Sequence, residues 1–525
     1  MARSNPPRLA AAVTALARAA LRPERPDRLP RAMVAMAAWG PTMAGAIAAS
    51  TARYPGAPAV IDGRGTLTFG ELWAATDGIA RGLRRRGVAT TGTVGILARN
   101  HRGFVMDVVA TAKLGADMVF LNTGFAGPQL ADVVAQEGID TVLHDDEYAD
   151  IVAGCGAAIT ASGRELATMA EDRSLMPLTP TRRSGRMVIL TSGTTGRPKG
   201  AARSGAGGGD GLTPLLSRVP LRARDTVVIA APLFHAWGLV HMGVGLGMSS
   251  TAVLQPQFDP EATLAAIADN RANGLVVVPV MLQRILALDG ETIARYDTSS
   301  LRYIASSGSA LGATLATAAI RRFGPILYNI YGSTEVSLAT IAGPDDLQAA
   351  PSTAGRPAPG SVVRIFDADG QPLGVDQVGR VFVGNRSHFD GYTGGGTKES
   401  IDGLLSSGDL GHFDRKGRLF IDGRDDDMII SGGENVFPAE VEDLLASHPS
   451  VAEAAVIGVP DEEFGQRLQA FVVRRPGTKL TERQVKDHVR THLARYKVPG
   501  TVVFIEALPR TTTGKLRRLD LREGG

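Results

Sequence analysis

Short β-branched runs alternate with stretches of helical periodicity over most of this 525-residue chain. The runs are TVGILA at 93–98, MVIL at 187–190, TVVIAA at 226–231, GLVVVP at 274–279 and LRYIAS at 301–306. Between them, apolar residues recur at helical spacing, as at 261–273 and 312–323. This alternation predicts an α/β fold of layered sheets whose strands are mostly parallel and buried on both faces.

The pattern of predicted strands and helices changes twice toward the C-terminus. After residue 355, Asp369-Gly370 separates two apolar runs, a hairpin signal that predicts a β-rich subdomain. Near Arg424, helical and strand patterns return, including a helix over 481–493 that opens with Thr481-x-x-Gln484. We therefore predict three parts: a helical N-terminal extension over 1–44, a large domain over 45–424 and a small α+β domain over 425–525.

Charge and cysteine content exclude several classes of protein. Lys plus Arg is 56 and Asp plus Glu is 53, so the net charge of +3 gives no electrostatic basis for nucleic-acid binding. The single cysteine, Cys155, excludes an intramolecular disulfide and a multi-cysteine zinc site. It also favours a reducing, cytoplasmic location, and we expect it to be buried.

Two apolar segments partly match export or membrane signals. Arg18 interrupts the alanine-rich stretch 9–21, which favours an additional surface helix over a cleaved signal peptide. The stretch 226–258 lacks Asp, Glu, Lys and Arg, but its two prolines and four glycines favour a strand, a loop and a buried helix. We therefore expect at most peripheral contact with a membrane.

The motif TSGTTGRPKG at 191–200 directly follows the predicted strand at 187–190. Glycine and small hydroxyl residues let amides and hydroxyls surround anionic oxygens closely, and Lys199 adds a positive charge. The motif departs from the G-x-x-x-x-G-K-[ST] phosphate loop, because Pro198 replaces the second glycine and Gly200 follows the lysine. No G-x-G-x-x-G follows a strand, which removes the main support for a nicotinamide- or flavin-binding fold.

The same motif resembles the signature of the adenylate-forming superfamily, which contains acyl-CoA synthetases, aryl-CoA ligases, peptide-synthetase adenylation domains and luciferases. Further blocks resemble the superfamily's landmarks in the same order: APLFHAWG at 231–238, SSGSALG at 306–312, NIYGSTE at 329–335, SGDLG at 407–411, GRLFIDGRDDDMIISGGENVFPAEVE at 417–442 and PRTTTGK at 509–515. The resemblance covers about residues 45–520 and is nearest to acyl-CoA synthetases of the long-chain fatty-acid–CoA ligase type.

This resemblance implies the activation of a carboxylic acid. ATP converts the acid to an acyl adenylate with release of pyrophosphate, and the thiol of coenzyme A then attacks the adenylate. ATP, Mg²⁺ and coenzyme A are the implied cofactors and co-substrates. The acid must approach a polyphosphate of the same charge, so catalysis consists mostly of charge neutralisation and alignment.

The resemblance assigns phosphate and metal contacts to two of the blocks. The β- and γ-phosphates would be held by Lys199 and by the loop residues Thr191, Ser192, Gly193, Thr194, Thr195 and Gly196, with Thr195 also near the metal. Thr334 would contact the α-phosphate, and Glu335 would hold Mg²⁺, which prefers oxygen ligands and keeps several waters. Considered alone, Glu335 could equally be a solvated acid.

Adenosine contacts are implied by three blocks. The residues at the adenine would be Gly308, Ser309, Ala310, Tyr331 and Gly332, with the Tyr331 ring stacked on the base. Asp409 would accept hydrogen bonds from both ribose hydroxyls, with Arg424 assisting it. The alternatives are a core tyrosine at 331 and a turn residue at 409.

Lys515 is the implied catalytic residue of adenylation, where its charge would lie between the carboxylate and the α-phosphate. The alternative is that Lys515 begins a solvated basic tail with Arg517 and Arg518. Only eight of the 56 basic residues are lysine, and Lys199 and Lys515 are two of them.

Asp426 matches the implied hinge about which a mobile C-terminal domain swings after adenylation. The swing would withdraw the lysine and bring Gly432, Gly433 and Glu434 to the thiol passage. A charged surface turn over 425–427 is the alternative, and both descriptions are compatible.

His235 would line the acyl and thiol passage, although a histidine on an apolar segment is also typical of a core. The uncharged stretch 233–254 offers no acidic partner for the ammonium group of an amino acid. We therefore predict a hydrophobic acid, foremost a medium- to long-chain fatty acid. Three alternatives remain: a fatty acyl-AMP ligase that loads a carrier protein, an inactive acyl-adenylate-binding protein and a luciferase-like oxygenase. A monomer and a homodimer are both compatible with the sequence.

Overall fold

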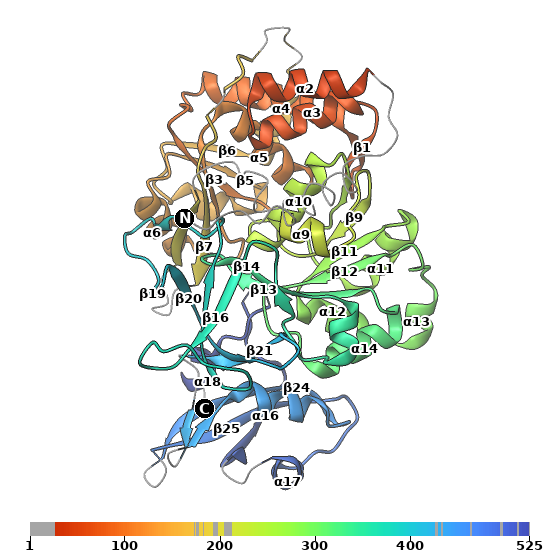
Figure 1. Ribbon diagram of the computed structural model, residues 1–525. Coiled ribbons are helices and arrows are strands. Elements are labelled where there is room, and N and C mark those ends of the chain that lie inside the picture. Colours follow the sequence, from red (N-terminus) through yellow and green to blue (C-terminus); the bar gives the residue numbers. More distant parts are fainter. Residues whose placement is uncertain are drawn as a thin grey trace.

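The computed structural model describes residues 27–172, 174, 178–181, 183–192, 198–203, 213–425, 429–431, 434–461, 465–493, 497–511 and 514–523. Three sheets form the large N-terminal part, and a fourth sheet forms the smaller C-terminal part, drawn in blue at the bottom of Figure 1. The predicted fold class is confirmed: layered α/β sheets, a β-rich subdomain and a small α+β C-terminal domain.

The largest sheet has nine strands and contains three of the predicted runs, at 226–231, 274–279 and 301–306. Its order is β15 (Arg356–Pro357), β14 (Ser337–Ala342), β13 (Leu327–Ser333), β12 (Tyr303–Ser306), β11 (Gly274–Val277), β9 (Thr226–Ile229), β10 (Thr251–Val253), β1 (Pro58–Asp62) and β2 (Gly65–Thr68). The strands from β13 to β1 are parallel. Every residue of β11 and β12 is buried, as expected for strands covered on both faces.

The second sheet has seven strands and contains the predicted runs at 93–98 and 187–190. Its order is β18 (Gly391–Tyr392), β8 (Pro198–Arg203), β7 (Met187–Ser192), β4 (Asp117–Phe120), β3 (Thr93–Leu97), β5 (Thr141–His144) and β6 (Ile159–Ser162). The edge strand β18 belongs to the β-rich part of the sequence, so it links that part to the phosphate-loop hairpin of β7 and β8.

Helices cover these two sheets and fill the connections between their strands. They are α2 (Arg28–Trp39), α3 (Met43–Arg53), α4 (Phe69–Arg85), α5 (Arg102–Leu114), α6 (Gly127–Glu137), α7 (Ala149–Ala153), α8 (Gly163–Ala170), α9 (Thr213–Arg218), α10 (Ala236–Gly247), α11 (Pro260–Asp269), α12 (Pro279–Leu286), α13 (Gly290–Ala294), α14 (Ala313–Phe323) and α15 (Pro344–Ala349), with a 3₁₀ turn at Asp146–Tyr148. The uncharged stretch 226–258 forms β9, a connecting segment and α10 as predicted, followed by a further strand, β10, that was not predicted. Within the described ranges, no helix is both long and apolar enough to cross a membrane.

The predicted N-terminal extension is not fully separate from the large domain. The predicted boundary at 44/45 falls inside α3, whose residues Ala44, Ile47 and Ala48 are buried in the main core. At least this part of the predicted extension therefore belongs to the large domain. The helix expected over 9–21 lies outside the described residues. Cys155 is buried, as expected.

The β-rich subdomain is antiparallel. Its strands are β16 (Val362–Phe366), β17 (Gly379–Gly384), β20 (Leu404–Phe413), β19 (Ser400–Ile401) and β21 (Leu419–Arg424). The predicted turn at Asp369-Gly370 forms, with the Asp367 amide donating to the Gln371 carbonyl at 2.9 Å. However, the full strand partner of β16 is β17, which lies after a longer connection.

The C-terminal sheet contains β23 (Glu434–Val436), β22 (Ile429–Ser431), β25 (Gly465–Arg474), β24 (Val451–Asp461) and β26 (Thr501–Phe504). It packs with α16 (Pro438–Ala446), α17 (Glu482–His492) and α18 (Arg518–Glu523). The predicted capping box at the start of α17 is present, with Thr481 and Gln484 satisfying each other's backbone amides. These elements build a core separate from that of the large domain.

Candidate active site

The carboxyl ends of three parallel strands carry predicted site residues. His235 follows β9, residues 308–310 follow β12, and Thr334 and Glu335 follow β13. Because β9, β12 and β13 run in the same direction in one sheet, the segments that follow them lie at the same edge. That edge is where open α/β sheets bind ligands.

Lys199 is presented by the β7–β8 hairpin. Thr191 and Lys199 are paired in the antiparallel register, and Thr191 Oγ1 donates to the Lys199 carbonyl at 3.2 Å. Thr191 is therefore held by its own hairpin. Gly193, Thr194, Thr195 and Gly196 lie outside the described residues, as does the side chain of Ser192, so their phosphate contacts stay predictions.

The Glu335 carboxylate is held by two neutral donors. Ser333 Oγ donates to Glu335 Oε2 at 2.9 Å, and Tyr392 Oη donates to Glu335 Oε1 at 3.1 Å. The adjacent Thr334 carbonyl accepts a hydrogen bond from Arg203 Nη2 at 2.6 Å. Both the main chain and the carboxylate at this predicted metal and phosphate position are therefore fixed in place.

Tyr331 and Asp409, predicted at the adenine and the ribose, are in direct contact. Tyr331 Oη donates to Asp409 Oδ2 at 2.6 Å. Arg424 lies opposite Asp409 in the β20–β21 register, and its Nη1 is 3.9 Å from Asp409 Oδ1. Burial raises the pKa of Asp409, and the Tyr331 hydrogen bond and Arg424 oppose that rise.

A tight turn in the C-terminal domain presents Lys515. Arg510 forms an antiparallel bridge with Leu516, and Arg510 Nη1 donates to the Gly514 carbonyl at 2.8 Å. Gly514 has φ +80°, and a Cβ at this position would lie 2.3 Å from Val280 Cγ1. Glycine is required here because the turn combines a left-handed backbone with close approach to α12.

Electrostatic effects show that Lys515 faces the large-domain residues. Solvent reaches its side chain, but surrounding protein and the charge of Arg424 lower the Lys515 pKa, whereas Glu335 and Asp409 oppose that change. Residues predicted from three distant blocks are thus close enough to influence one protonation equilibrium.

His235 lies beside the same lysine. Burial, with the charge of Lys515, lowers the pKa of His235 to about 3, so its imidazole is neutral at pH 7. Its Nε2 is buried and has no hydrogen-bond partner among the described residues. A core histidine is usually hydrogen-bonded, so this unpaired atom favours a position facing a ligand.

A cavity of about 310 Å³ opens between the large domain and the Lys515 turn. Phe234 and Gly514 line it, together with Arg99, Arg284 and Arg510. This cavity is therefore lined by residues of both domains, including three arginines.

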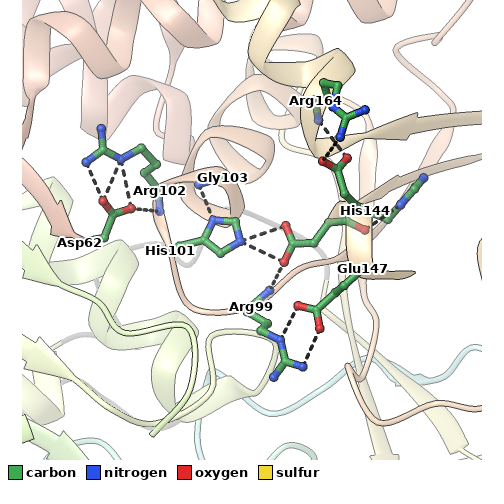
Figure 2. Close-up of polar contacts among 10 residues, drawn as sticks. Asp62, Arg99, His101, Arg102, Gly103, His144, Glu147 and Arg164 are labelled. Carbon is green, nitrogen blue, oxygen red and sulfur yellow. Dashed lines mark hydrogen bonds and ion pairs between the residues drawn. The ribbon is translucent and has the colours of Figure 1, made fainter. Parts of the chain in front are cut away.

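A polar cluster fixes one of these arginines (Figure 2). Arg99 Nε and Nη2 donate to the two carboxylate oxygens of Glu147 at 2.5 and 2.8 Å, and the Arg99 amide donates to Asp145 Oδ2 at 2.8 Å. His101 Nε2 lies 2.9 Å from the same Asp145 oxygen. Because a bidentate pair restricts the guanidinium, Arg99 occupies the cavity wall in a defined orientation.

Other predicted site residues that the structure describes form no hydrogen bond or ion pair with Lys515 or Glu335. Gly308, Ser309 and Ala310 lie in an exposed loop between β12 and α14, and Gly332 lies within β13. Asp426, Gly432, Gly433 and the side chain of Glu434 lie outside the described residues. Their roles as adenine, hinge and thiol-passage residues stay predictions.

Sequence reasoning missed Ser333, Arg203 and Tyr392. Ser333 lies inside the NIYGSTE block, so its proximity to Glu335 was available from the spacing. Tyr392 is 57 residues from Glu335, and Arg203 is 131 residues from Thr334. No pattern in one sequence pairs residues at such separations.

The oxygen chemistry of Glu335 fits a magnesium ion. The described part of the chain has no cluster of three or more His, Cys, Asp or Glu side chains suited to a metal. Mg²⁺ does not need such a cluster, because it commonly takes one or two carboxylates plus waters and substrate phosphates. Glu335, with both oxygens oriented by neutral donors, meets that requirement.

Comparisons with known proteins identify the family. Residues 47–393 match the family described as AMP-binding enzyme, and residues 440–515 match the AMP-binding enzyme C-terminal domain. The chain belongs to this adenylate-forming family. It is therefore an acid–thiol ligase that works through an acyl adenylate.

Individual relatives span nearly the whole chain. It is 33% identical over 496 residues to an indoleacetate–CoA ligase of Aromatoleum aromaticum, covering 89% of this chain and 95% of that protein. It is 31% identical over 496 residues to the fatty acid–[acyl-carrier-protein] ligase ScoC of Streptomyces coeruleorubidus, covering 89% and 93%. The ATP-bound crystal structure of MatB from Rhodopseudomonas palustris has a TM-score of 0.81 at 29% identity, covering 92% and 98%.

Proposed function

We propose that this adenylate-forming enzyme uses ATP and Mg²⁺ to convert a hydrophobic carboxylic acid to its acyl adenylate, and then transfers the acyl group to coenzyme A. The observation that carries the proposal is that the turn of Gly514 and Lys515 lies against Val280 of the large domain, where Glu335 and Asp409 act on the charge of Lys515. Lys515 would offset charge between the acid and the α-phosphate, and Asp409 would hold the ribose. Bound Mg²⁺ would neutralise phosphate charge beside Glu335.

Neutral histidines support an uncharged acyl group. Burial lowers the pKa of His241, on α10, to about 4, and His235 is also neutral at pH 7. Neither imidazole therefore offers a cation to a second carboxylate. The helix α10 also carries no acidic residue for a substrate ammonium group. A hydrophobic monocarboxylic acid satisfies both conditions.

Medium- and long-chain fatty acids remain our first candidates within this class, and aryl acids are the second. The names of the relatives include both kinds, since one acts on indoleacetate and another on a fatty acid. The buried, unpaired Nε2 of His235 would gain a partner from the bound carboxylate or adenylate, and an unpaired buried polar atom costs about 1–3 kcal/mol.

The interdomain cavity supports a thiol co-substrate that carries phosphate. Arg99 is already paired with Glu147, and Arg510 with Glu453 at 2.5 Å. Arg284 forms no ion pair among the described residues and is exposed beside the cavity. Coenzyme A and the phosphopantetheine arm of a carrier protein share this chemistry, so the acceptor must be tested directly.

The test is ATP–pyrophosphate exchange with panels of fatty, aryl and amino acids, followed by product analysis with coenzyme A and with a phosphopantetheinylated carrier protein. We expect exchange with hydrophobic acids and an acyl-CoA product. Exchange with amino acids alone would contradict the proposed substrate class. Acyl transfer only to the carrier protein would contradict the proposed acceptor. Binding of acyl adenylate without exchange would identify an inactive binding protein.

A further inference from the structure

Tyr392 lies where two sheets and the β-rich subdomain meet. In the β18–β8 register it is paired with Ala201, two residues after Lys199. Nearby, the Phe389 amide donates to the Glu335 carbonyl at 2.9 Å. The segment around Tyr392 is therefore attached both to the phosphate-loop hairpin and to the chain that follows β13.

The Tyr392 side chain touches two groups predicted at the triphosphate. Its hydroxyl donates to Glu335 Oε1 at 3.1 Å, and Lys199 Nζ lies 5.5 Å from the centroid of its ring. That distance is within the range of a cation–π interaction, which extends to about 6 Å. Burial and the charge of Glu335 raise the Tyr392 pKa, so the phenol stays a donor at neutral pH.

The hydrogen bonds to Glu335 leave the negative charge of its carboxylate in place, because both donors are neutral. Ser333 and Tyr392 each donate one neutral hydrogen bond, one to each carboxylate oxygen. A carboxylate has about four lone-pair sites, so acceptor capacity remains for a cation. Arg203 donates to the Thr334 carbonyl and to Ser337 Oγ, and so fixes the main chain. The charge of Glu335 acts on Arg203, but the two side chains form no ion pair within 4 Å among the described residues.

A purely structural role is the alternative. The Tyr392 ring packs edge-on against Phe389 at 4.9 Å between centroids, and this contact could serve only to attach the subdomain. Phenylalanine keeps the ring contacts with Phe389 and Lys199 and removes only the hydroxyl. Leucine removes both. The two substitutions therefore separate the structural contact from the orientation of Glu335.

We propose that Tyr392 is a positioning residue that sets Glu335 and Lys199 at the spacing required by a metal-bound triphosphate. The inference rests on the proposed function, since it takes ATP with Mg²⁺ as the ligand. It goes beyond that function by assigning the link between the phosphate lysine and the metal-binding acid to a side chain on β18, the edge strand that the β-rich part of the sequence adds to the second sheet.

Calorimetric titration with ATP, in excess Mg²⁺ and in metal-free buffer, tests this role without catalysis. We expect Tyr392→Phe to weaken binding of Mg·ATP about ten- to a hundredfold, the effect of one hydrogen bond to a charged group, and to leave metal-free ATP within about twofold. Tyr392→Leu should weaken both, because the ring beside Lys199 is lost. Tyr296→Phe is the matched control, since it removes a tyrosine–carboxylate bond to Glu261 at 2.9 Å elsewhere in the fold.

Two outcomes would overturn the inference. One is wild-type affinity of Tyr392→Phe for Mg·ATP, and the other is equal weakening with and without metal, which indicates a structural role. The proposed function fails separately, through lack of pyrophosphate exchange by the wild-type enzyme. Transfer from a supplied acyl adenylate to coenzyme A should stay within about twofold in Tyr392→Phe, because no triphosphate takes part in that step.

Discussion

The two halves of the candidate active site are held in place by different kinds of contact. Lys199 and Asp409 lie in strands of two different sheets, and Glu335 follows a strand of a third. Tyrosine hydroxyls bond to Asp409 and Glu335 across long sequence separations. The turn that presents Lys515 is instead stabilised mainly by its own residues, including the Arg510 bond to the Gly514 carbonyl.

Among the described residues, the contacts between the two domains involve α12, α14 and β21 of the large domain. Gly514 lies against Val280, Gln283 Nε2 donates to the Ala452 carbonyl at 3.2 Å, and Asp443 approaches Gly312. A turn that is held by bonds within its own domain can leave the large domain without disturbing the contacts around Glu335 and Asp409. The difference therefore predicts that adenylation needs both halves, whereas thiol transfer does not need Lys515.

Removing the lysine should produce the largest effect. We expect Lys515→Ala to slow adenylate formation about 100- to 1,000-fold, as for loss of one preorganised group that stabilises transition-state charge. Transfer from a supplied acyl adenylate to coenzyme A should change little. Pyrophosphate exchange measures the first step and acyl-CoA formation the second. The exposed Lys479 of the same domain provides the control substitution Lys479→Ala. Equal loss of both steps would contradict the division between the halves.

The second-largest effect should come from a change in how the turn packs against α12. Alanine at 514 combines φ +80° with a Cβ 2.3 Å from Val280 Cγ1, so Gly514→Ala should slow adenylation about ten- to a hundredfold. Gly477→Ala is a matched control, because Gly477 has φ +76° but no atom within 4 Å of the added Cβ. We expect the control to lower the melting temperature slightly without changing the ratio of the two half-reactions. A similar loss of adenylation in both variants would indicate strain alone.

Much of the fold was predictable because it depends on local patterns. The runs at 274–279 and 301–306 are buried on both faces as β11 and β12, and a doubly buried strand has a continuous apolar sequence. The capping box at Thr481 was likewise visible in four consecutive residues. The boundary at 44/45 was not predictable in this way, since α3 joins the core through contacts with distant segments.

The residues of the candidate site likewise differ in whether a local sequence pattern reveals them. Motif blocks identified Glu335, Asp409 and Lys515, because each lies in a short run of unusual composition. Tyr392 and Arg203 lie in runs without such a signal, and their contacts become visible only when β18 pairs with β8. Sequence reasoning thus predicted groups at the ligand and missed groups that hydrogen-bond to them.

A smaller effect is expected within the large-domain half. Tyr331→Phe removes the 2.6 Å hydrogen bond to Asp409 and should raise the KM for ATP about three- to tenfold, with kcat little changed. Without this donor the Asp409 pKa rises further, so the KM should increase more steeply below neutral pH than in the wild type. Initial rates against ATP concentration at several pH values check both statements.

Tyr328→Phe, at a half-buried tyrosine of the same strand, is the control. An unchanged KM would show that the bond does not orient Asp409 for the ribose.

The smallest effect should come from the domain contact at Asp443. Solvent reaches the Asp443 side chain, but the surrounding protein and the charge of Glu442 raise its pKa to about 6 in the arrangement described, above the ordinary carboxyl value. The described arrangement therefore binds more protons than one in which Asp443 is solvated, and its stability falls as pH rises from about 4 to about 6. Above that range the charged carboxylate disfavours the contact.

Asp443→Asn removes the charge and should shift the balance toward adenylation about twofold at pH 7.5, with the difference shrinking below about pH 6 and disappearing as the pH approaches 4. The ratio of the two half-reaction rates across this range measures the shift, and Asp487→Asn on α17, where the side chain is half-exposed, is the control. A shift that is independent of pH would mean that the substituted amide acts through packing against Gly312 rather than through loss of charge. In that case protonation of Asp443 would not control how the Lys515 half attaches to the large domain. Only the packing of residue 443 against Gly312 would affect that attachment.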